Sequence, residues 1–188
     1  MSNKIFFTLL LAIALCFGSI ASATLIPYTS ITPTTSLVHL SSWTLDKIAD
    51  GVTNDYVFPD GGFVSTSTSG TVHLTFNQNF NLTSFVLWND VNIGDQGVRT
   101  FRLDFFNEVG MLLSSTSTLN AISILDQQIY AFSAVQNVKK VDFVILTSAY
   151  QIEIREVSFN GVASVPEFSS LVLMALGILT LMFGNNKK

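Results

Sequence analysis

Apolar and polar residues alternate along most of the middle of the chain. The alternation is clearest in residues 72–76, 101–105 and 152–155, where every second side chain is apolar and the side chains between them are polar or charged. A period of two places successive side chains on opposite faces of a β-strand. These stretches therefore predict strands with one buried face and one exposed face.

Two other stretches, residues 82–88 and 141–146, are apolar on both faces, which is typical of central strands covered on either side. Residues 107–110 lie between two strand-like stretches and predict a hairpin, in which Gly110 supplies a positive φ. No helical period of 3.6 residues runs through residues 24–165. The pattern predicts an all-β fold of about eight strands that closes as a β-sandwich.

The first 23 residues have the three parts of a secretory signal peptide. A charged start is followed by an apolar stretch over residues 5–17, and the small residues Ala21 and Ala23 precede Thr24. The apolar stretch is too short to cross a hydrocarbon core of about 30 Å, so we expect cleavage by signal peptidase after Ala23 and export. The alternative is a lipoprotein signal at Cys16, but the residue before it is a bulky leucine.

Composition narrows the range of partners of the exported part. Cys16 is the only cysteine, so the mature chain expected after cleavage has no disulfide and no thiol chemistry. Residues 24–165 hold six of the nine basic residues and twelve of the thirteen acidic residues, which gives a net charge of about −6. Because phosphate would be repelled, we exclude nucleic acid as a partner, whereas neutral sugars or calcium fit this balance.

The C-terminal part predicts a membrane segment. Residues 168–184 are uncharged and apolar apart from two serines and a threonine, and Lys187 and Lys188 follow them. As a helix this stretch is about 25 Å long, close to the thickness of a bilayer core. The lysines are expected on the cytoplasmic side, with the β domain outside. The alternative, a buried core helix, is disfavoured because the stretch has no polar face.

The residues before this segment carry a resemblance. Val165, Pro166 and Glu167, followed by the apolar span and the basic end, resemble the PEP-CTERM sorting signal of Gram-negative bacteria that make exopolysaccharide, over residues 163–188. The resemblance implies that an exosortase, an intramembrane sorting enzyme, recognises the Pro-Glu pair and processes the tail. The third motif position holds Phe168 rather than proline, and two lysines replace the usual arginine cluster. A plain C-terminal anchor is the alternative.

A second resemblance covers residues 41–162, with residues 24–40 as a lead-in. An Asp-Gly loop at residues 47–51, a strand core at residues 85–90 and 99–105, and a closing stretch at residues 154–161 follow each other at the spacing seen in discoidin or coagulation-factor C-type domains. The resemblance implies the galactose-binding-like jelly-roll β-sandwich. In many relatives the Asp-Gly loop and the closing glutamate surround a structural calcium ion.

The calcium ligands implied by this resemblance are Asp50, Asp55 and Glu156, since calcium prefers hard oxygen ligands. The apolar phase slips between Ile154 and Val157, which predicts a bulge near Glu156. The alternative is that the Asp-Gly pair is an ordinary turn and that Glu156 is a solvated strand end. No other cofactor is expected.

Sugar binding needs an aromatic face for the ring and polar groups beside it. Trp88, Asn89, Arg99 and Tyr150 lie at predicted strand ends and are the candidate sugar contacts. The alternative places Trp88 in the core and Arg99 on the surface as a solvated charge.

Signs of catalysis are weak. His39 and His73 have no neighbour at metal-ligand spacing, His73 is expected on the face opposite to its apolar neighbours, and no Gly-x-Ser-x-Gly motif is present. Asp104 and Glu108 are a conceivable carboxylate pair, but sequence does not fix their separation.

We therefore expect an exported envelope or matrix protein, not an enzyme, whose sandwich binds a carbohydrate such as exopolysaccharide. A ligand-free structural or adhesive surface protein is the alternative, and a polysaccharide hydrolase comes last.

Overall fold

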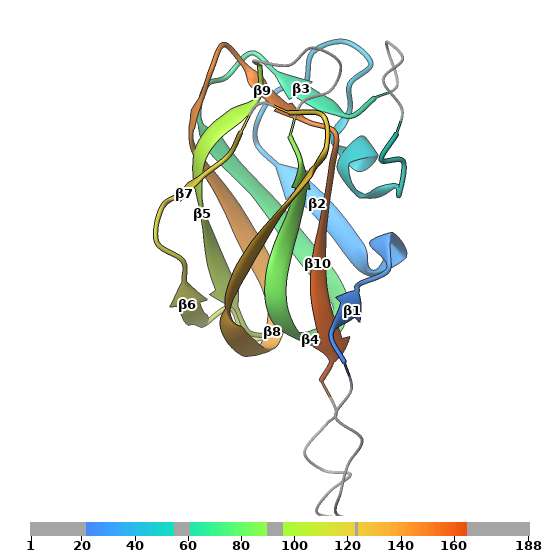
Figure 1. Cartoon of the computed structure of the whole chain (residues 1–188), viewed down its shortest axis with the longest axis vertical. Coiled ribbons are helices and arrows are strands. Elements are labelled where there is room, and N and C mark those ends of the chain that lie inside the picture. Colours follow the sequence, from blue (N-terminus) through green and yellow to red (C-terminus); the bar gives the residue numbers. More distant parts are fainter. Residues whose placement is uncertain (1–21, 55–60, 90–95, 123, 165–188) are drawn as a thin grey trace, which may run out of the picture. The chain divides into compact units, whose positions relative to one another are not determined.

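The computed structural model describes residues 22–54, 61–89, 96–122 and 124–164, and these contain ten strands and two 3-10 helices (Figure 1). The all-β prediction is confirmed for these residues. The strands are β1 (Thr24–Leu25), β2 (Ile31–Thr35), β3 (Phe63–Ser65), β4 (Gly70–Trp88), β5 (Val98–Phe106), β6 (Leu112–Ser115), β7 (Leu119–Asn120), β8 (Gln127–Ser148), β9 (Ile152–Ile154) and β10 (Glu156–Ala163). The helices are η1 (Tyr28–Ser30) and η2 (Leu45–Ala49).

One antiparallel sheet holds eight of these strands. Its order is β1-β10-β4-β8-β5-β6, with β2 also paired to β4 and β7 also paired to β5. The remaining strands, β3 and β9, pair with each other. The chain thus returns repeatedly across the sheet, and strands distant in sequence become neighbours.

The ladder between the two longest strands, β4 and β8, bends over on itself. Irregular pairing between Thr75 and Phe80 separates the two halves of β4. The Phe85 ring, in the second half, lies 5.1 Å from the Phe143 ring. Phe143 is nevertheless paired in the ladder with Val72, in the first half of β4. The two halves of the ladder therefore face each other and form the two layers of a β-sandwich.

Each layer can now be described by its strands. The first layer contains β1, β10, residues 80–88 of β4 and residues 127–138 of β8. The second layer contains β2, residues 70–75 of β4, residues 140–148 of β8, and then β5 with β6 and β7.

Aromatic side chains fill the space between the layers. Phe85 contacts Phe101 and Phe159 with ring centroids 5.7 and 5.1 Å apart, and Phe76 contacts Phe159 at 5.3 Å. The predicted inward faces of residues 72–76 and 101–105 are confirmed: Val72, Leu74, Phe76, Phe101, Leu103 and Phe105 are all buried.

The prediction of strands covered on both faces holds for only one of the two stretches. In the second half of β4, Phe85, Val86 and Leu87 are consecutive and buried. In β8, by contrast, Leu146 is 37% exposed and Val144 is only half-buried. The expectation for residues 141–146 is therefore wrong, because the outer face of the second layer is open to solvent there.

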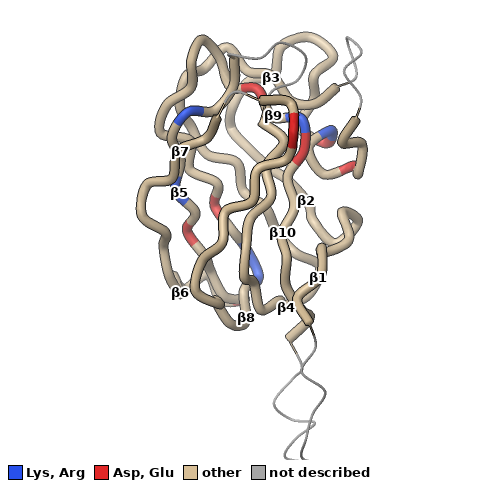
Figure 2. Tube along the Cα trace, viewed as in Figure 1, with Lys and Arg blue, Asp and Glu red and all other residues tan. Residues whose placement is uncertain are grey.

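The strand predicted in residues 152–155 is present as β9, but its expected exposed face is wrong, since Glu153 and Arg155 are buried like the isoleucines beside them. β9 ends at Ile154 in the small sheet and β10 begins at Glu156 in the main sheet. Between them, the Arg155 N–H donates to the Trp88 carbonyl at 2.9 Å. Figure 2 shows acidic and basic positions close together where the chain passes from β9 to β10.

This change of sheet accounts for the phase slip that the sequence shows near Glu156. The expected bulge is not there, since the irregular pairing of β10 falls between Asn160 and Gly161 instead.

The compact unit that contains the sandwich runs from Ser22 to Ser164. The stretch expected as a lead-in, residues 24–40, contributes β1 and β2 to the main sheet, so the sandwich begins earlier than residue 41. The hairpin prediction is confirmed, with the Gly110 N–H donating to the Asn107 carbonyl at 3.0 Å and Gly110 at φ 79°.

The two ends of the sandwich are formed by different strands and loops. The end where β4 finishes at Trp88, β5 starts at Val98 and β8 finishes at Ser148 is called the loop end below. Figure 1 shows it near β3 and β9, whereas β1 and the last residues of β10 lie at the opposite end. There the Ser164 N–H donates to the Asn79 carbonyl.

The predicted signal peptide, apart from its last two residues, and the predicted sorting tail, apart from its first two residues, lie outside the described residues. Within the part of the chain that is described, no helix has both the length and the apolar character that a membrane crossing needs.

Candidate functional site

At the loop end, Asn89 holds two loops in place. Its side-chain N–H groups donate to the carbonyls of Val98 and Ile122 at 2.8 and 3.0 Å, and its side-chain oxygen accepts the Val98 N–H at 2.8 Å. The residue is completely buried. Asn89 therefore belongs to the framework of the loop end, and its burial does not support its candidate role as a sugar contact.

The segment after β8 is fixed to the segment before β5. The Ala149 N–H donates to the Gly97 carbonyl at 3.1 Å, and the Gln151 side-chain amide bonds to Gln96 at 3.3 Å and to the buried Glu153 at 2.5 Å. The bonds to Gly97 and Gln96 join residues more than 50 positions apart. They hold the residues on either side of Tyr150 in place. Tyr150 itself lies at the surface of the loop end and is 74% exposed.

The other two candidate sugar contacts are half-buried strand residues. Trp88 is the last residue of β4 and pairs with Gln127 and Glu156. Arg99 lies in β5, one residue after the Val98 that Asn89 holds. The backbone thus brings all four candidate residues to the same end of the sandwich, and Tyr150 is the one with a widely exposed ring.

A pair of carboxyl groups meets beside this end. The Gly51 N–H donates to Oε2 of Glu156 at 3.1 Å, across 105 positions of sequence, and the Val52 N–H donates to Oδ1 of Asp50 at 2.9 Å. The Asp-Gly loop and the closing glutamate therefore come together, as the sequence resemblance implied. Asp55, the third expected ligand, lies outside the described residues.

Tyr28 also belongs to this cluster, although it was not among the residues expected there. Gly51 adopts φ 88°, and a Cβ placed there would lie 3.1 Å from Cδ2 of the Tyr28 ring. Burial and the nearby Glu156 raise the pKa of Tyr28. No spacing rule links residue 28 to either carboxylate.

The electrostatics of the cluster favour a proton on Glu156. Burial, and then the negative charge of Asp50, raise the pKa of Glu156 from 4.5 to about 9. The side chain is completely buried, and its Oε1 has no hydrogen-bond partner among the described residues. Two carboxyl groups this close cannot both be ionised cheaply unless a cation sits between them.

These residues fit a hard cation as far as they are described. Asp50 and Glu156 offer carboxylate oxygens, and one of those oxygens lacks a partner, which suits calcium coordination. Within the described ranges, no three His, Cys, Asp or Glu side chains gather closely enough to share a metal.

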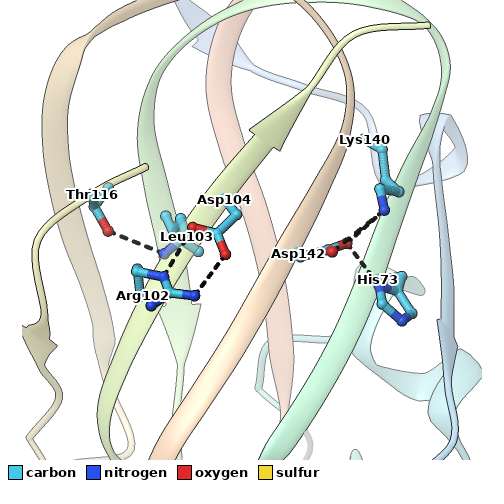
Figure 3. Close-up of polar contacts among 7 residues, drawn as sticks. All are labelled: His73, Arg102, Leu103, Asp104, Thr116, Lys140 and Asp142. Carbon is cyan, nitrogen blue, oxygen red and sulfur yellow. Dashed lines mark hydrogen bonds and ion pairs between the residues drawn. The ribbon is translucent and has the colours of Figure 1, made fainter. Parts of the chain in front are cut away.

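Polar groups on the outer face of the second layer pair with each other (Figure 3). Nδ1 of His73 lies 2.7 Å from Oδ1 of Asp142, and Nζ of Lys140 lies 3.1 Å from the same oxygen. His39, the other histidine, is exposed and bonds to the Ser41 carbonyl. The predicted placement of His73 on the face opposite to its apolar neighbours is confirmed, because those neighbours are buried and His73 is half-buried. The two histidines make separate contacts, one with Asp142 and one with Ser41.

The carboxylate pair considered for hydrolysis is not arranged for it. Nε and a terminal nitrogen of Arg102 each donate to Asp104 at 2.9 Å (Figure 3). Partial burial raises the pKa of Asp104, but Arg102 and the Ser115 hydroxyl lower it below its ordinary value. Glu108 lies in the exposed hairpin turn. Asp104 is therefore held ionised and is unsuited to act as a general acid.

Comparison with solved structures identifies the fold. The family 32 carbohydrate-binding module of NanJ from Clostridium perfringens, solved with galactose, is similar with a TM-score of 0.61 and 9% identity, over 73% of this chain and 98% of that chain. A fucose-binding module from Streptococcus pneumoniae is similar with a TM-score of 0.58 and 13% identity, over 73% of this chain and 95% of that chain.

An F5/8 type C domain from Bacteroides fragilis is also similar, with a TM-score of 0.54 and 13% identity over 77% of this chain and 99% of that chain. No protein-family model matches the sequence, and no curated protein matches it either. The likeness confirms the predicted discoidin-like, galactose-binding-like β-sandwich.

Proposed function

We propose that this protein is an exported surface or matrix protein whose sandwich binds a neutral carbohydrate at the loop end. The observation that carries the proposal is the exposed Tyr150 ring on a segment held by the Gly97–Ala149 and Gln96–Gln151 bonds. An exposed aromatic ring on a segment held by these bonds, with amide side chains nearby, suits a pyranose, which has an apolar face and a polar edge. Similar folds bind galactose and fucose, which supports this ligand class.

The charge of the domain supports a neutral ligand. The whole chain has a net charge of −4. Among the four candidate sugar contacts at the loop end, only Arg99 is cationic. An anionic polysaccharide would be repelled, whereas a neutral one would not.

The positions of the first and last residues of the sandwich support its display on a surface. Thr24, the first residue after the predicted signal cleavage, is the first residue of β1, and Ser164 directly precedes the sorting motif. Both lie at the end opposite to Tyr150. A tail that leaves from Ser164 would therefore be attached at the end away from the sugar site.

Replacing the exposed ring tests the sugar site. We expect Tyr150→Ala to weaken retention on galactose or fucose supports by about 3- to 10-fold, because it removes the stacking face. Met111→Ala is the matched control, since Met111 is 59% exposed on the hairpin at the other end. If the wild-type protein is retained on no neutral glycan, with or without calcium, a structural or adhesive role replaces this proposal.

The sorting tail is tested in the native host. If an exosortase recognises Pro166 and Glu167, mass spectrometry should find wild-type protein that ends before Lys188, and Glu167→Ala should stay full-length in the membrane. The conservative Glu167→Asp keeps the charge and serves as the comparison. A wild-type protein that keeps Lys188 would show that residues 168–184 are only an anchor.

A further inference from the structure

A groove separates the two layers on the flank of the sandwich, away from the loop end. It has a volume of about 250 Å³. Residues 114–117, in and after β6, form one wall, and four residues of β8 form the other: Ala131, Phe132, Ser133 and Val135. We call this the flank groove.

The fold itself creates the groove. Nearer the loop end, the Gln128 side chain bridges the layers, accepting the Ile122 N–H and donating to the Ile122 carbonyl, both at 2.8 Å. The Tyr130 hydroxyl donates to Gln128 at 2.7 Å. Beyond this bridge, the pairing of β8 with β4 becomes irregular after Ala131. The bridge holds the layers together on one side of the groove, and the irregular strand keeps the other side open.

The walls combine an aromatic surface with hydroxyl groups. The half-buried Phe132 packs on the buried Phe105 with ring centroids 4.9 Å apart, so its ring is held in place. Ser114, Ser117 and Ser133 are exposed around it. None of the described residues that line the groove is charged.

The surrounding surface is uncharged as well. From Val109 to Val138 the chain contains one charged residue, Asp126, although charged residues make up 12% of the whole sequence. Figure 2 shows this stretch in tan along β6 and the first half of β8. A charged ligand would find no counter-ion there, whereas a neutral ligand loses nothing.

We propose that the flank groove is a second carbohydrate subsite, which takes one pyranose ring of a neutral glycan against Phe132. The inference rests on the proposed carbohydrate binding and adds a site at a different place. The volume lies just below the range of drug-sized pockets, which suits one ring rather than a longer chain segment. The serine hydroxyls can donate to and accept from sugar hydroxyls.

Filling the groove tests the proposal. Ala131 is exposed and lines the groove, so Ala131→Trp should occupy it, whereas Ala134→Trp adds the same side chain on the same strand outside the lining. The full chain is measured in a non-glycosidic detergent for retention on supports that carry galactose or fucose oligosaccharides. We expect Ala131→Trp to weaken retention at least fivefold and Ala134→Trp to leave it unchanged.

The opposite wall gives an independent variant if Ala131→Trp fails to fold. Ser117→Trp should have the same effect, with the exposed Thr118→Trp outside the lining as its control. Thermal melting of each variant shows whether the fold is kept.

The outcomes separate this inference from the proposed function. If Tyr150→Ala loses retention and both groove variants keep it, the flank groove is not a sugar site and the loop end is. If the groove variants lose retention and Tyr150→Ala keeps it, the groove stands and the loop-end site fails. A wild-type chain that binds no neutral glycan, or a dimer that the groove variants dissociate, would overturn the subsite.

Discussion

Glu156→Gln is expected to make the protein more stable than wild type at pH 8 in the presence of a chelator. The side chain is completely buried, and burial together with Asp50 raises its pKa to about 9. Glutamine has the shape of the protonated carboxyl group and still accepts the Gly51 N–H. It has no acidic proton to lose, so it stays neutral at pH 8. The expected gain in the free energy of unfolding is on the order of 3 kcal/mol.

The sign follows from proton linkage. In the unfolded chain Glu156 loses its proton near its ordinary value of 4.5, whereas in the folded protein it keeps the proton up to about pH 9. Between these values the folded state binds more protons than the unfolded state, so stability falls as pH rises. The contribution is complete below about pH 4.5 and is lost progressively up to about pH 9.

Urea unfolding curves between pH 5 and pH 8.5 measure this effect. Wild type should lose stability across the range, and Glu156→Gln should give a flatter profile. Glu108→Gln removes the same charge from an exposed turn and should follow the wild-type profile. Parallel profiles for Glu156→Gln and wild type would mean that Glu156 is ionised in the folded protein.

A calcium ion could bind the same cluster in place of the proton on Glu156. An ion that binds only the folded state raises the melting temperature by mass action, and here it would replace the proton on Glu156. Calcium should therefore raise the melting temperature of wild type at pH 8 but not that of Asp50→Ala or Glu156→Gln. Equal wild-type melting curves with calcium and with chelator would show that the cluster binds a proton but not calcium.

Strands could be predicted from the sequence where they have one face of apolar residues and one face of polar residues. The inward residues of β4 and β5 repeat with period two, and that period holds wherever one face meets the core and the other meets solvent. The stretch from Glu153 to Glu156 broke the rule because the chain changes sheets there and is covered on both sides. A local pattern contains no sign of which sheet a strand joins.

The candidate site was predictable only in part, for a related reason. The meeting of Asp50 and Glu156 followed from a resemblance in the order of motifs and is seen in the bond from Gly51. Tyr28 was missed because it reaches the cluster through η1, with no spacing relation to either carboxylate. Asn89 is a candidate sugar contact in the sequence because a strand-end asparagine looks the same whether it faces solvent or holds a loop, as it does here.

The bend in the β4 and β8 ladder leads to the second large expected effect, because one side chain joins its two halves. Phe85 lies in the second half of β4, and its ring is within 5.7 Å of the rings of Phe101, Phe143 and Phe159. Phe101 and Phe143 belong to the second layer, and Phe159 belongs to the first. Phe85 thus packs across the interior between the layers as well as along its own layer.

Phe85→Ala is expected to lower the free energy of unfolding by about 3–5 kcal/mol, since it leaves a cavity that three ordered rings cannot close. Phe106→Ala is the matched control: Phe106 is half-buried on the outer face of β5 under Lys140, so its loss should cost about 1 kcal/mol. Urea unfolding of both variants measures the difference. If the two variants lost equal stability, the two halves of the ladder would not depend on Phe85 to pack together, and the bend would have to be stabilised mainly by the irregular pairing between Thr75 and Phe80.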